Sequence, residues 1–282
     1  MKILVTGATG FIGKNLIPKL LEKKYKVVAI ARSSEPIKNF DWFSRIDFIQ
    51  LDLYESYKDV FHNQTDIKIL IHLAWQNLPN YKESFHLTEN LPKNYEFLKA
   101  AINQKIPHIL VAGSCLEYGM QSGPLSEDLE TQPSTAYGLA KDSLRKLLDK
   151  LKLEQDFIFQ WLRIFYIFGE GQAKNSLLSK LDMAIENGDK EFMLSMGTQM
   201  RDYLSITEVV DNIILAISNT EIQGIINCCS GNPISVLDLV RNRCKERGAN
   251  IKLIRGFYKI PEYEPFHFWG IPTKIRKIKN SR

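Results

Sequence analysis

Short apolar runs alternate with segments of helical periodicity along residues 2–167. The runs carry Val, Ile and Leu at successive positions, a pattern typical of strands that are buried on both faces. The strands predicted in this way are Lys2–Thr6, Tyr25–Ala31, Ile46–Leu51, Ile67–Leu73, Pro107–Ala112 and Phe157–Ile167. Between them, apolar residues recur at helical spacing, which predicts helices over Lys14–Lys24, Asn90–Gln104 and Thr135–Leu153.

This alternation predicts an α/β fold, a doubly wound parallel sheet of the Rossmann type, because parallel strands need crossover helices that cover the sheet. Residues 1–168 would form this dinucleotide-binding domain. Glycines interrupt the pattern after residue 168, so residues 169–202 and 246–282 are predicted to form a smaller C-terminal substrate-binding lobe. Residues 203–245 would return in part to the main sheet, with strands at Asp202–Ile206 and Gly224–Cys229 and helices at Val209–Ser218 and Ser235–Lys245.

The composition indicates a globular protein, since 44% of the 282 residues are hydrophobic and 24% are charged. No apolar run reaches the roughly 18 residues that a membrane-spanning helix needs. The chain starts with a strand pattern, so we expect no secretory signal. No C-x-x-C pair and no histidine at zinc-site spacing accompanies the four cysteines, Cys115, Cys228, Cys229 and Cys244. These features predict reduced thiols, a cytoplasmic location and no metal site.

The formal net charge of +5 arises from the last nine residues, which contain five cations and no acid: Lys274, Arg276, Lys277, Lys279 and Arg282. No basic face with interleaved aromatic residues recurs elsewhere, which argues against a nucleic-acid partner. We interpret the tail as a solvated end of the chain. Attraction to an anionic ligand or an acidic membrane surface is the weaker alternative.

Three glycines follow the first predicted strand at the spacing G-x-x-G-x-x-G, within TGATGFIG at residues 6–13. A side chain at Gly7 or Gly10 would block the tight turn or the approach of the backbone to a pyrophosphate, and Gly13 lets the next helix pack near the strand. The free N–H groups at the helix start would face the phosphates. Strand, turn and helix in this order predict a dinucleotide site; the alternative is a glycine-rich turn in an ordinary α/β unit.

A second group of residues has the chemistry of a carbonyl/alcohol oxidoreductase. Tyr137 and Lys141 are four residues apart on a predicted helix, which puts them on one face. Ser114 follows the fifth predicted strand, at the sheet edge where ligands bind in this architecture. The lysine ammonium would favour the tyrosinate form of Tyr137, whose pKa is otherwise near 10, and so support proton transfer to an oxygen that Ser114 contacts. Taken alone, Y-x-x-x-K is also typical of a surface pair.

The chain resembles the extended short-chain dehydrogenase/reductase family, which includes nucleotide-sugar epimerases, dehydratases and reductases. The resemblance covers nearly the whole chain. It rests on motifs in family order: TGATGFIG at 6–13, Asp52-Leu53, IHLA at 71–74, Asn90, GSCLEYG at 113–119, YGLAK at 137–141, RIFYIFGEGQ at 163–172 and RDYLSITEVV at 201–210.

The resemblance implies that Ser114, Tyr137 and Lys141 are the catalytic residues. It places Asp52 on the adenine amino group, Ala74 beside the nicotinamide half of the cofactor, and Lys141 also on the nicotinamide ribose. The expected cofactor contacts are Gly7, Thr9, Gly10, Phe11, Ile12, Gly13, Arg32, Asp52, Leu53, Leu73, Ala74, Tyr137 and Lys141.

The end of the second predicted strand discriminates between the two nicotinamide cofactors. Enzymes that use NAD place an acid there to bind the ribose 2′-hydroxyl, whereas those that use NADP need a cation. The sequence reads Ala31-Arg32-Ser33, with no acid before Glu35. Because a guanidinium can bind a 2′-phosphate with two hydrogen bonds, we expect NADP(H) to be preferred. The alternative is that Arg32 lies on the surface and that NAD(H) is also accepted.

Four positions are expected to contact the substrate: Trp75, Cys115, Tyr166 and Arg201. The resemblance implies that Arg201 and the loop Gly169–Gln172 hold the diphosphate of a nucleotide sugar, where a cation suits the doubly charged ligand. Tyr166 replaces an asparagine that is common in the family. Trp75 is interpreted either as narrowing the sugar pocket or as packing under the interface between the lobes.

Dehydration is disfavoured, because the family's dehydratases carry an Asp-Glu pair directly after the active-site Ser or Thr, where this chain has Cys115-Leu116. Glu117 is interpreted as an orienting or surface carboxylate. The leading hypothesis is an NADPH-dependent reductase of a nucleotide-activated 4-keto-6-deoxy-sugar, which makes a deoxysugar donor for bacterial surface polysaccharide such as O-antigen. The alternatives are an NAD-dependent 4-epimerase and a cofactor-sensing or scaffold protein. A homodimer is expected through the helices near 90–104 and 135–153, where Ala136, Leu139 and Leu147 would contribute.

Overall fold

A seven-stranded, fully parallel sheet forms the centre of the computed structural model, which describes residues 1–57, 60–61 and 66–280. Its strand order, β12-β7-β5-β4-β1-β2-β3, is that of a Rossmann-like doubly wound fold, so the predicted fold class is confirmed. The strands are β1 (Lys2–Thr6), β2 (Lys26–Ala31), β3 (Asp47–Gln50), β4 (Ile67–His72), β5 (His108–Ser114), β7 (Ile158–Ile164) and β12 (Gly224–Cys228).

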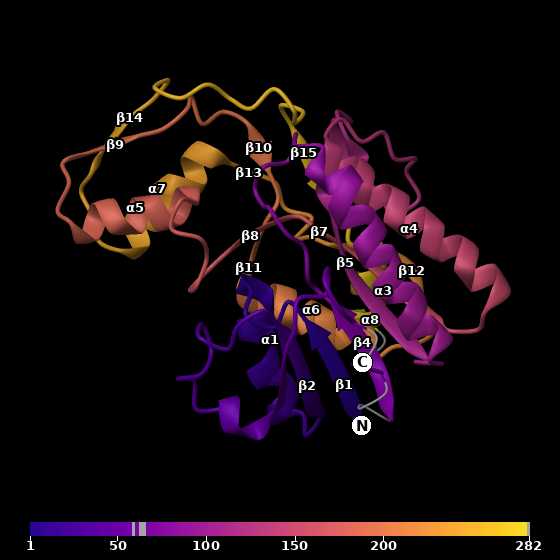
Figure 1. The fold of residues 1–282 in the computed structure, drawn as a ribbon. Helices are drawn as coiled ribbons and strands as arrows, with labels where there is room; N and C mark the ends of the chain where they lie inside the picture. The colour runs from indigo at the N-terminus through magenta and orange to yellow at the C-terminus, as the bar shows by residue number, and fades with distance from the viewer. Residues whose placement is uncertain (58–59, 62–65, 281–282) are drawn as a thin grey trace.

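Two layers of helices cover this sheet (Figure 1). On one face lie α1 (Phe11–Glu22), α6 (Ile206–Ile217) and α8 (Thr273–Asn280); on the other lie α3 (Leu91–Asn103) and α4 (Ala136–Glu154). Successive strand residues supply the two cores. In β1, Ile3 and Val5 pack under α1 and α6, whereas Leu4 packs under α3 and α4. This alternation explains why the strands read as continuous apolar runs.

Four helices begin at a residue whose side chain caps the first turn: α4, α5 (Leu177–Glu186), α6 and α7 (Val236–Glu246). The Thr135 hydroxyl accepts the N–H of Gly138 at the start of α4, and Ser205 forms a capping box with Glu208 at the start of α6. A π-helix, η2 (His86–Asn90), runs directly into α3. Insertions of this kind are frequent at functional sites.

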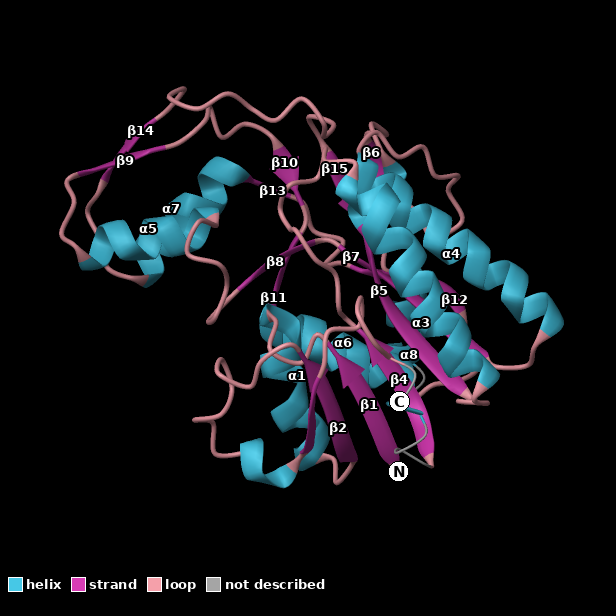
Figure 2. Ribbon diagram, in the orientation of Figure 1, coloured by secondary structure: helices cyan, strands magenta, loops and turns pink. Residues whose placement is uncertain are grey.

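A smaller lobe stands apart from the main sheet, at the upper left of Figure 2. Its core packs α5 (Leu177–Glu186) against α7 (Val236–Glu246). Four short strand pairs lie outside the main sheet: β9 (Glu191–Met193) with β14 (Lys252–Ile254), β10 (Met200–Arg201) with β13 (Ile234–Ser235), β8 (Tyr166–Phe168) with β11 (Tyr203–Ser205), and β6 (Gly123–Leu125) with β15 (Phe268–Gly270). The β9–β14 pair lies beside the core of the smaller lobe, whereas the β6–β15 pair lies beside α4 (Figure 2). Two 3₁₀ turns, η1 (Phe43–Arg45) and η3 (Cys115–Tyr118), complete the described elements.

Several details differ from the sequence-based expectations. The run predicted as one strand over 157–167 is two strands, because the chain leaves the main sheet at Phe165 and pairs with β11 as β8. The helix α7 packs in the smaller lobe and not on the main sheet. The basic tail is not a solvated end: it forms α8, which buries Ile275 and Ile278 against β12 and α6, while Arg282 lies outside the described residues.

The Asp202 carboxylate connects three segments of the chain, around residues 202, 230 and 270, through hydrogen bonds. It is fully buried and accepts the backbone N–H groups of Ser230 (2.7 Å), Gly231 (2.9 Å) and Gly270 (3.3 Å). Burial raises the pKa of this carboxyl, and the three donors oppose that rise. Within the described ranges, no helix combines the length and the apolar character that crossing a membrane requires.

Candidate functional site

The glycine turn after β1 is closed so tightly that side chains are excluded from it. Gly7 has a φ of +67°, and a Cβ added there would lie 2.8 Å from the backbone nitrogen of Ala74. A Cβ at Gly13 would lie 2.5 Å from the carbonyl oxygen of Gly7. Helix α1 follows with Gly10 as its N-cap and no side chain capping its first turn. The turn therefore leaves backbone room and helix N–H groups for a phosphate, as a dinucleotide site requires.

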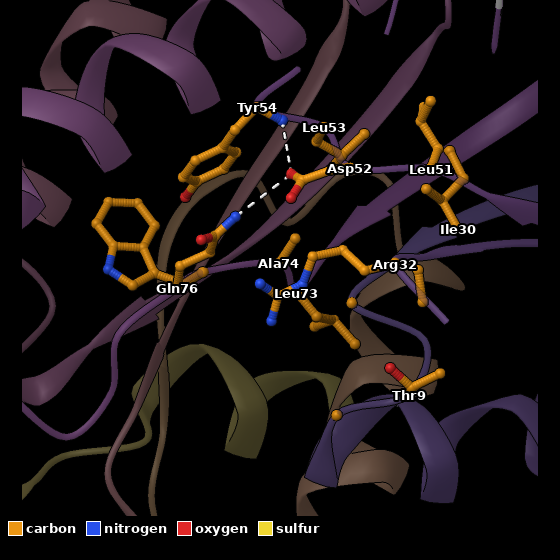
Figure 3. A pocket seen from close by; sticks show the side chains of 14 residues that line it. Thr9, Ile30, Arg32, Leu51, Asp52, Leu53, Tyr54, Leu73, Ala74 and Gln76 are labelled. Carbon is orange, nitrogen blue, oxygen red and sulfur yellow. Dashed lines mark hydrogen bonds between the residues drawn. The ribbon is translucent and has the colours of Figure 1, made fainter. Parts of the chain in front are cut away.

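A cavity of about 190 Å³ opens beside this turn, at the carboxyl ends of β1, β2 and β4 (Figure 3). It lies where ligands bind in doubly wound sheets. Most of the expected cofactor residues line it, including Gly7, Thr9, Gly10, Arg32, Asp52, Leu53, Leu73 and Ala74. Ile30, Ala31, Leu51, Tyr54, Trp75 and Gln76 complete the lining. The expected residues Phe11, Ile12 and Gly13 belong to the first turn of α1, next to the cavity.

Asp52 and Arg32 are the charged side chains of this lining. The Asp52 carboxylate accepts the backbone N–H of Tyr54 at 2.9 Å and the side-chain amide of Gln76 at 3.4 Å (Figure 3). Arg32 is exposed and extends among the lining residues from the end of β2. No carboxylate among the lining residues comes from the end of β2.

Ser114, Tyr137 and Lys141 come together at the carboxyl end of β5, as the sequence predicts. Ser114 ends β5 and hydrogen-bonds with the Tyr137 hydroxyl. The Lys141 ammonium donates to the Ala112 carbonyl at 2.8 Å and lies 6.0 Å from the Tyr137 ring centroid. All three side chains are buried.

Burial opposes charge on both members of the tyrosine–lysine pair. It raises the pKa of Tyr137, an effect that the hydrogen bond from Ser114 opposes. It lowers the pKa of Lys141 to about 7, although the nearby Glu117 carboxylate favours the charged form. The site therefore keeps Tyr137 protonated, as a proton donor must be, and holds Lys141 near the midpoint of its titration at neutral pH.

Glu117 fixes the strand end that carries Ser114. Its carboxylate is fully buried and accepts the Ser114 backbone N–H at 2.7 Å, the Trp161 indole N–H at 2.9 Å and the Arg163 Nε–H at 2.7 Å. A Cβ at Gly113 would lie 2.2 Å from the Trp161 indole nitrogen, so only glycine fits there. Of the two interpretations made from the sequence, the orienting carboxylate agrees with this geometry.

Trp75 lies where the cavity meets the catalytic residues. Its indole face lies 3.8 Å from the Lys141 ammonium, and its ring packs edge-on against Tyr137 with centroids 5.8 Å apart. The indole N–H donates to His86 at 3.2 Å. The ring thus borders the first cavity and Lys141 together, and the two interpretations of Trp75 made from the sequence stay predictions.

A second cavity, of about 690 Å³, lies between the smaller lobe and the C-terminal segment. Tyr166 and Arg201, two of the four expected substrate residues, line it. The Arg201 guanidinium is buried and forms an ion pair with Glu264, with a shortest N–O distance of 2.9 Å. Cys115 lines neither cavity: it packs in a buried cluster with Tyr118, Leu125 and Phe165, and burial raises the pKa of its thiol.

Local sequence did not predict the hydrogen-bond partner of Trp75 or the ion-pair partner of Arg201. His86 lies 11 residues after Trp75 and Glu264 lies 63 residues after Arg201, and neither forms part of a recognisable motif. The sequence signals for them are a histidine four residues before Asn90 and an acid between Tyr263 and Phe266. Within the described part of the chain, no three His, Cys, Asp or Glu side chains gather as metal ligands would.

Comparisons with known proteins agree with this geometry. A sequence profile described as "NAD dependent epimerase/dehydratase family" matches residues 3–229. A dTDP-6-deoxy-L-talose 4-dehydrogenase (NAD(+)) of Aggregatibacter actinomycetemcomitans is 32% identical over 275 residues, which span 96% of this chain and 99% of that protein. A dTDP-4-dehydro-6-deoxyglucose reductase of Escherichia coli is 27% identical over 90% of this chain and 84% of its own length.

Solved structures resemble the whole chain. The UDP-glucuronic acid 4-epimerase of Bacillus cereus, solved with UDP-glucuronic acid and NAD, superimposes with a TM-score of 0.85. It is 26% identical, and the match covers 100% of this chain and 94% of that one.

Proposed function

We propose that this chain, which belongs to the NAD-dependent epimerase/dehydratase family, reduces the 4-keto group of a nucleotide-activated 6-deoxy-sugar. The chain is an oxidoreductase of the extended short-chain dehydrogenase/reductase type. Two relatives with matches over most of their length are named for redox chemistry of deoxysugar nucleotides, one as a 4-dehydrogenase and one as a reductase. A 4-dehydrogenase and a 4-ketoreductase catalyse one reaction in opposite directions.

The observation that carries the proposal is the place of Tyr137 between the two cavities. Its ring contacts Trp75, which lines the first cavity. It also contacts Tyr81, which packs against Tyr263 of the second cavity, with ring centroids 5.4 and 5.8 Å apart. A proton donor placed between a dinucleotide cavity and a larger second cavity suits a reaction in which hydride and proton add to one substrate.

The roles of the catalytic side chains follow from their contacts. A nicotinamide cofactor held at the glycine turn would supply the hydride that adds to the carbonyl carbon. Tyr137 donates its proton to the oxygen, which receives the electron pair of the carbonyl double bond, and an alcohol results. Ser114 donates a hydrogen bond to that oxygen, and the Lys141 ammonium stabilises the tyrosinate left behind until solvent returns a proton. Glu117 keeps Ser114 in place through the strand backbone.

We propose NADP(H) as the preferred cofactor, with NAD(H) as the alternative. The support is Arg32 at the end of β2, with no carboxylate from that strand end in the cavity. The support for NAD(H) is that a 32% identical relative is named as NAD(+)-dependent.

The second cavity is proposed to hold the nucleoside diphosphate of the substrate, with Tyr166 in its wall and Arg201 as the cation nearest the phosphates. The product would be a deoxysugar donor for bacterial surface polysaccharide. We also propose a homodimer through α3 and α4, because Leu139 and Leu147 of α4 are 42% and 40% exposed.

A 4-epimerase of nucleotide sugars is the second candidate, favoured by the likeness over the whole chain to an epimerase of 26% identity. The two candidates differ in their net chemistry. An epimerase returns its hydride to the same substrate and consumes no reductant. A reductase consumes one NAD(P)H for each product formed.

The Tyr137→Phe variant tests the proposal on a panel of dTDP-, GDP- and UDP-linked 4-keto-6-deoxy-sugars. The wild type should oxidise one NAD(P)H per product, and the variant should lose on the order of a hundredfold or more in kcat while still binding the cofactor. Lack of turnover with every 4-keto sugar, together with epimerisation of UDP-sugars without net cofactor oxidation, would replace the reductase by the epimerase.

A further inference from the structure

The environment of the Lys141 ammonium contains an aromatic partner as well as the protein backbone. One of its N–H groups donates to the Ala112 carbonyl at 2.8 Å, and the indole face of Trp75 lies 3.8 Å away on another side. An indole face at this distance attracts a buried cation, and the attraction grows as water is excluded. Lys141 is only 3% exposed, so the contact acts in a largely dry environment.

Trp75 is itself held in place by His86 of the π-helix η2. His86 is fully buried, and its Nε2–H donates to the Asn80 carbonyl at 3.1 Å. Since a carbonyl only accepts, the proton lies on Nε2 and the Nδ1 lone pair is free to accept. Nδ1 receives the Trp75 indole N–H at 3.2 Å and the Asn90 amide at 3.0 Å. Burial lowers the pKa of His86, which keeps this neutral tautomer.

A series of hydrogen bonds, buried except at the half-buried Tyr54, connects His86 to the first strand. The Thr6 hydroxyl donates to His72 Nδ1 at 2.9 Å, and His72 Nε2–H donates to the side-chain oxygen Oδ1 of Asn94 at 2.7 Å. The Asn94 amide donates to the Tyr54 hydroxyl at 2.8 Å, which donates to the Asn90 side-chain oxygen. Each group in this series donates to the next one. Consecutive hydrogen bonds of this kind strengthen one another and hold their side chains in one arrangement.

We propose that Trp75 is a positioning residue for Lys141 and that His86 holds the indole in the orientation this requires. The inference rests on the proposed function, because it concerns the lysine of the catalytic set. In this arrangement the indole face favours the charged form of Lys141 and fixes its side chain beside Tyr137. A charged Lys141 is the form that stabilises the tyrosinate after proton transfer.

Other charges also act on Lys141 and must be kept constant in any test. Tyr137 lies on the same helix, Glu117 approaches from η3, and His72 and His86 approach from the end of β4 and from η2. A test of the indole must therefore change Trp75 or its orientation and keep Tyr137, Glu117 and His72. Variants of His86 must be compared with each other, because each of them removes the same imidazole.

The pH dependence of kcat in Trp75→Leu tests the inference. Loss of the indole face should make Lys141 lose its proton more easily, so the alkaline limb of the profile should move about half to one pH unit lower. Trp75→Phe, which keeps a weaker aromatic face, should move it by less. Trp269→Leu, a tryptophan of β15 outside both cavities, is the control and should keep the wild-type profile. A Trp75→Leu profile that matches the control would overturn the inference.

His86 variants separate orientation from simple loss of packing. His86→Gln keeps an oxygen that accepts the indole N–H, and its profile should stay near the wild type. His86→Leu removes the acceptor and should shift the limb in the direction of Trp75→Leu. Equal shifts in the two His86 variants would show that the acceptor has no role.

A fluorescence titration keeps this inference distinct from the proposed reaction, since it needs no substrate. The emission of Trp75, taken as wild type minus Trp75→Phe, should change with pH as Lys141 titrates, and the change should disappear in Lys141→Met. The same titration in Lys141→Met would refute the inference. A lysine-dependent titration in an enzyme that reduces no 4-keto sugar would instead leave the inference standing and refute the proposed function.

Discussion

The Glu264 carboxylate forms a buried ion pair with the Arg201 guanidinium. Arg201 Nη2 and Nε donate to one carboxylate oxygen at 2.9 and 3.2 Å, and the side chains of Arg201 and Glu264 are 3% and 8% exposed. Arg201 Nη1 donates to the carbonyls of Met200 and Phe266. The cation that was expected to bind a diphosphate is thus neutralised by a residue from the C-terminal segment that lines the same cavity.

We therefore expect Glu264→Gln to bind nucleoside diphosphates more tightly than the wild type. The neutral amide leaves the Arg201 charge available to a phosphate, and the expected gain is about three- to tenfold in Kd for dTDP, GDP or UDP by calorimetry. The same variant should lose about 1–3 kcal/mol of unfolding free energy, because a buried ion pair loses one of its charges.

Glu262→Gln is the matched control, since Glu262 is an exposed acid two residues earlier in the same segment. It should change neither quantity appreciably. Weaker diphosphate binding by Glu264→Gln than by the control would show that the ion pair supports the cavity and does not compete with the ligand.

Arg32→Ala tests the cofactor preference. If the guanidinium binds the 2′-phosphate, the variant should lose on the order of 10- to 100-fold in NADPH affinity and less than about twofold in NADH affinity. Fluorescence titration of both nucleotides measures this. Lys38→Ala, the next cation along the chain, should affect neither nucleotide. A wild type that binds NADH as well as NADPH would assign the enzyme to NAD(H).

Lys141→Met should stabilise the fold in a manner that depends on pH. Burial lowers the pKa of Lys141 to about 7, whereas in the unfolded chain it is near 10.4. Below pH 7 both states carry the proton and the folded state bears the full cost of a buried charge. Between about pH 7 and 10 only the unfolded state binds the proton, so the wild type gains stability as the pH rises.

The variant should therefore exceed the wild type by on the order of 3 kcal/mol at pH 6, a difference that shrinks toward pH 10. Urea unfolding at pH 6, 8 and 9.5 measures it. Lys150→Met, which removes an exposed lysine of the same helix, should show no such dependence. A difference between Lys141→Met and the wild type that stays constant from pH 6 to 9.5 would contradict the prediction.

The sequence predicts which residues meet at the candidate catalytic site, because the members of that site obey local rules. Tyr137 and Lys141 are one helical turn apart, Ser114 ends a strand, and Gly7 follows one, so short-range pattern places all four at the same sheet edge. The same rules misassign α8, where Ile275 and Ile278 are the only apolar residues in a basic segment and their burial depends on β12 and α6.

The contacts that the sequence does not predict join side chains that lie far apart along the chain. The partner of Arg201 lies on another segment, and the indole of Trp75 is oriented by a histidine whose acceptor role depends on Asn80. Neither spacing nor residue type shows such contacts, because burial and hydrogen-bond direction decide them only after the chain has folded.

The short strand pairs outside the main sheet also set the order in which a nascent chain can complete its two cavities. Three pairings form only after a late segment has been synthesised: β6 (residues 123–125) with β15 (268–270), β9 with β14, and Arg201 with Glu264. On the ribosome, the glycine turn and all seven strands of the main sheet emerge before these partners have been synthesised. The first cavity can thus form during synthesis, whereas the second cavity, proposed to hold the substrate, is complete only after Glu264 has been translated.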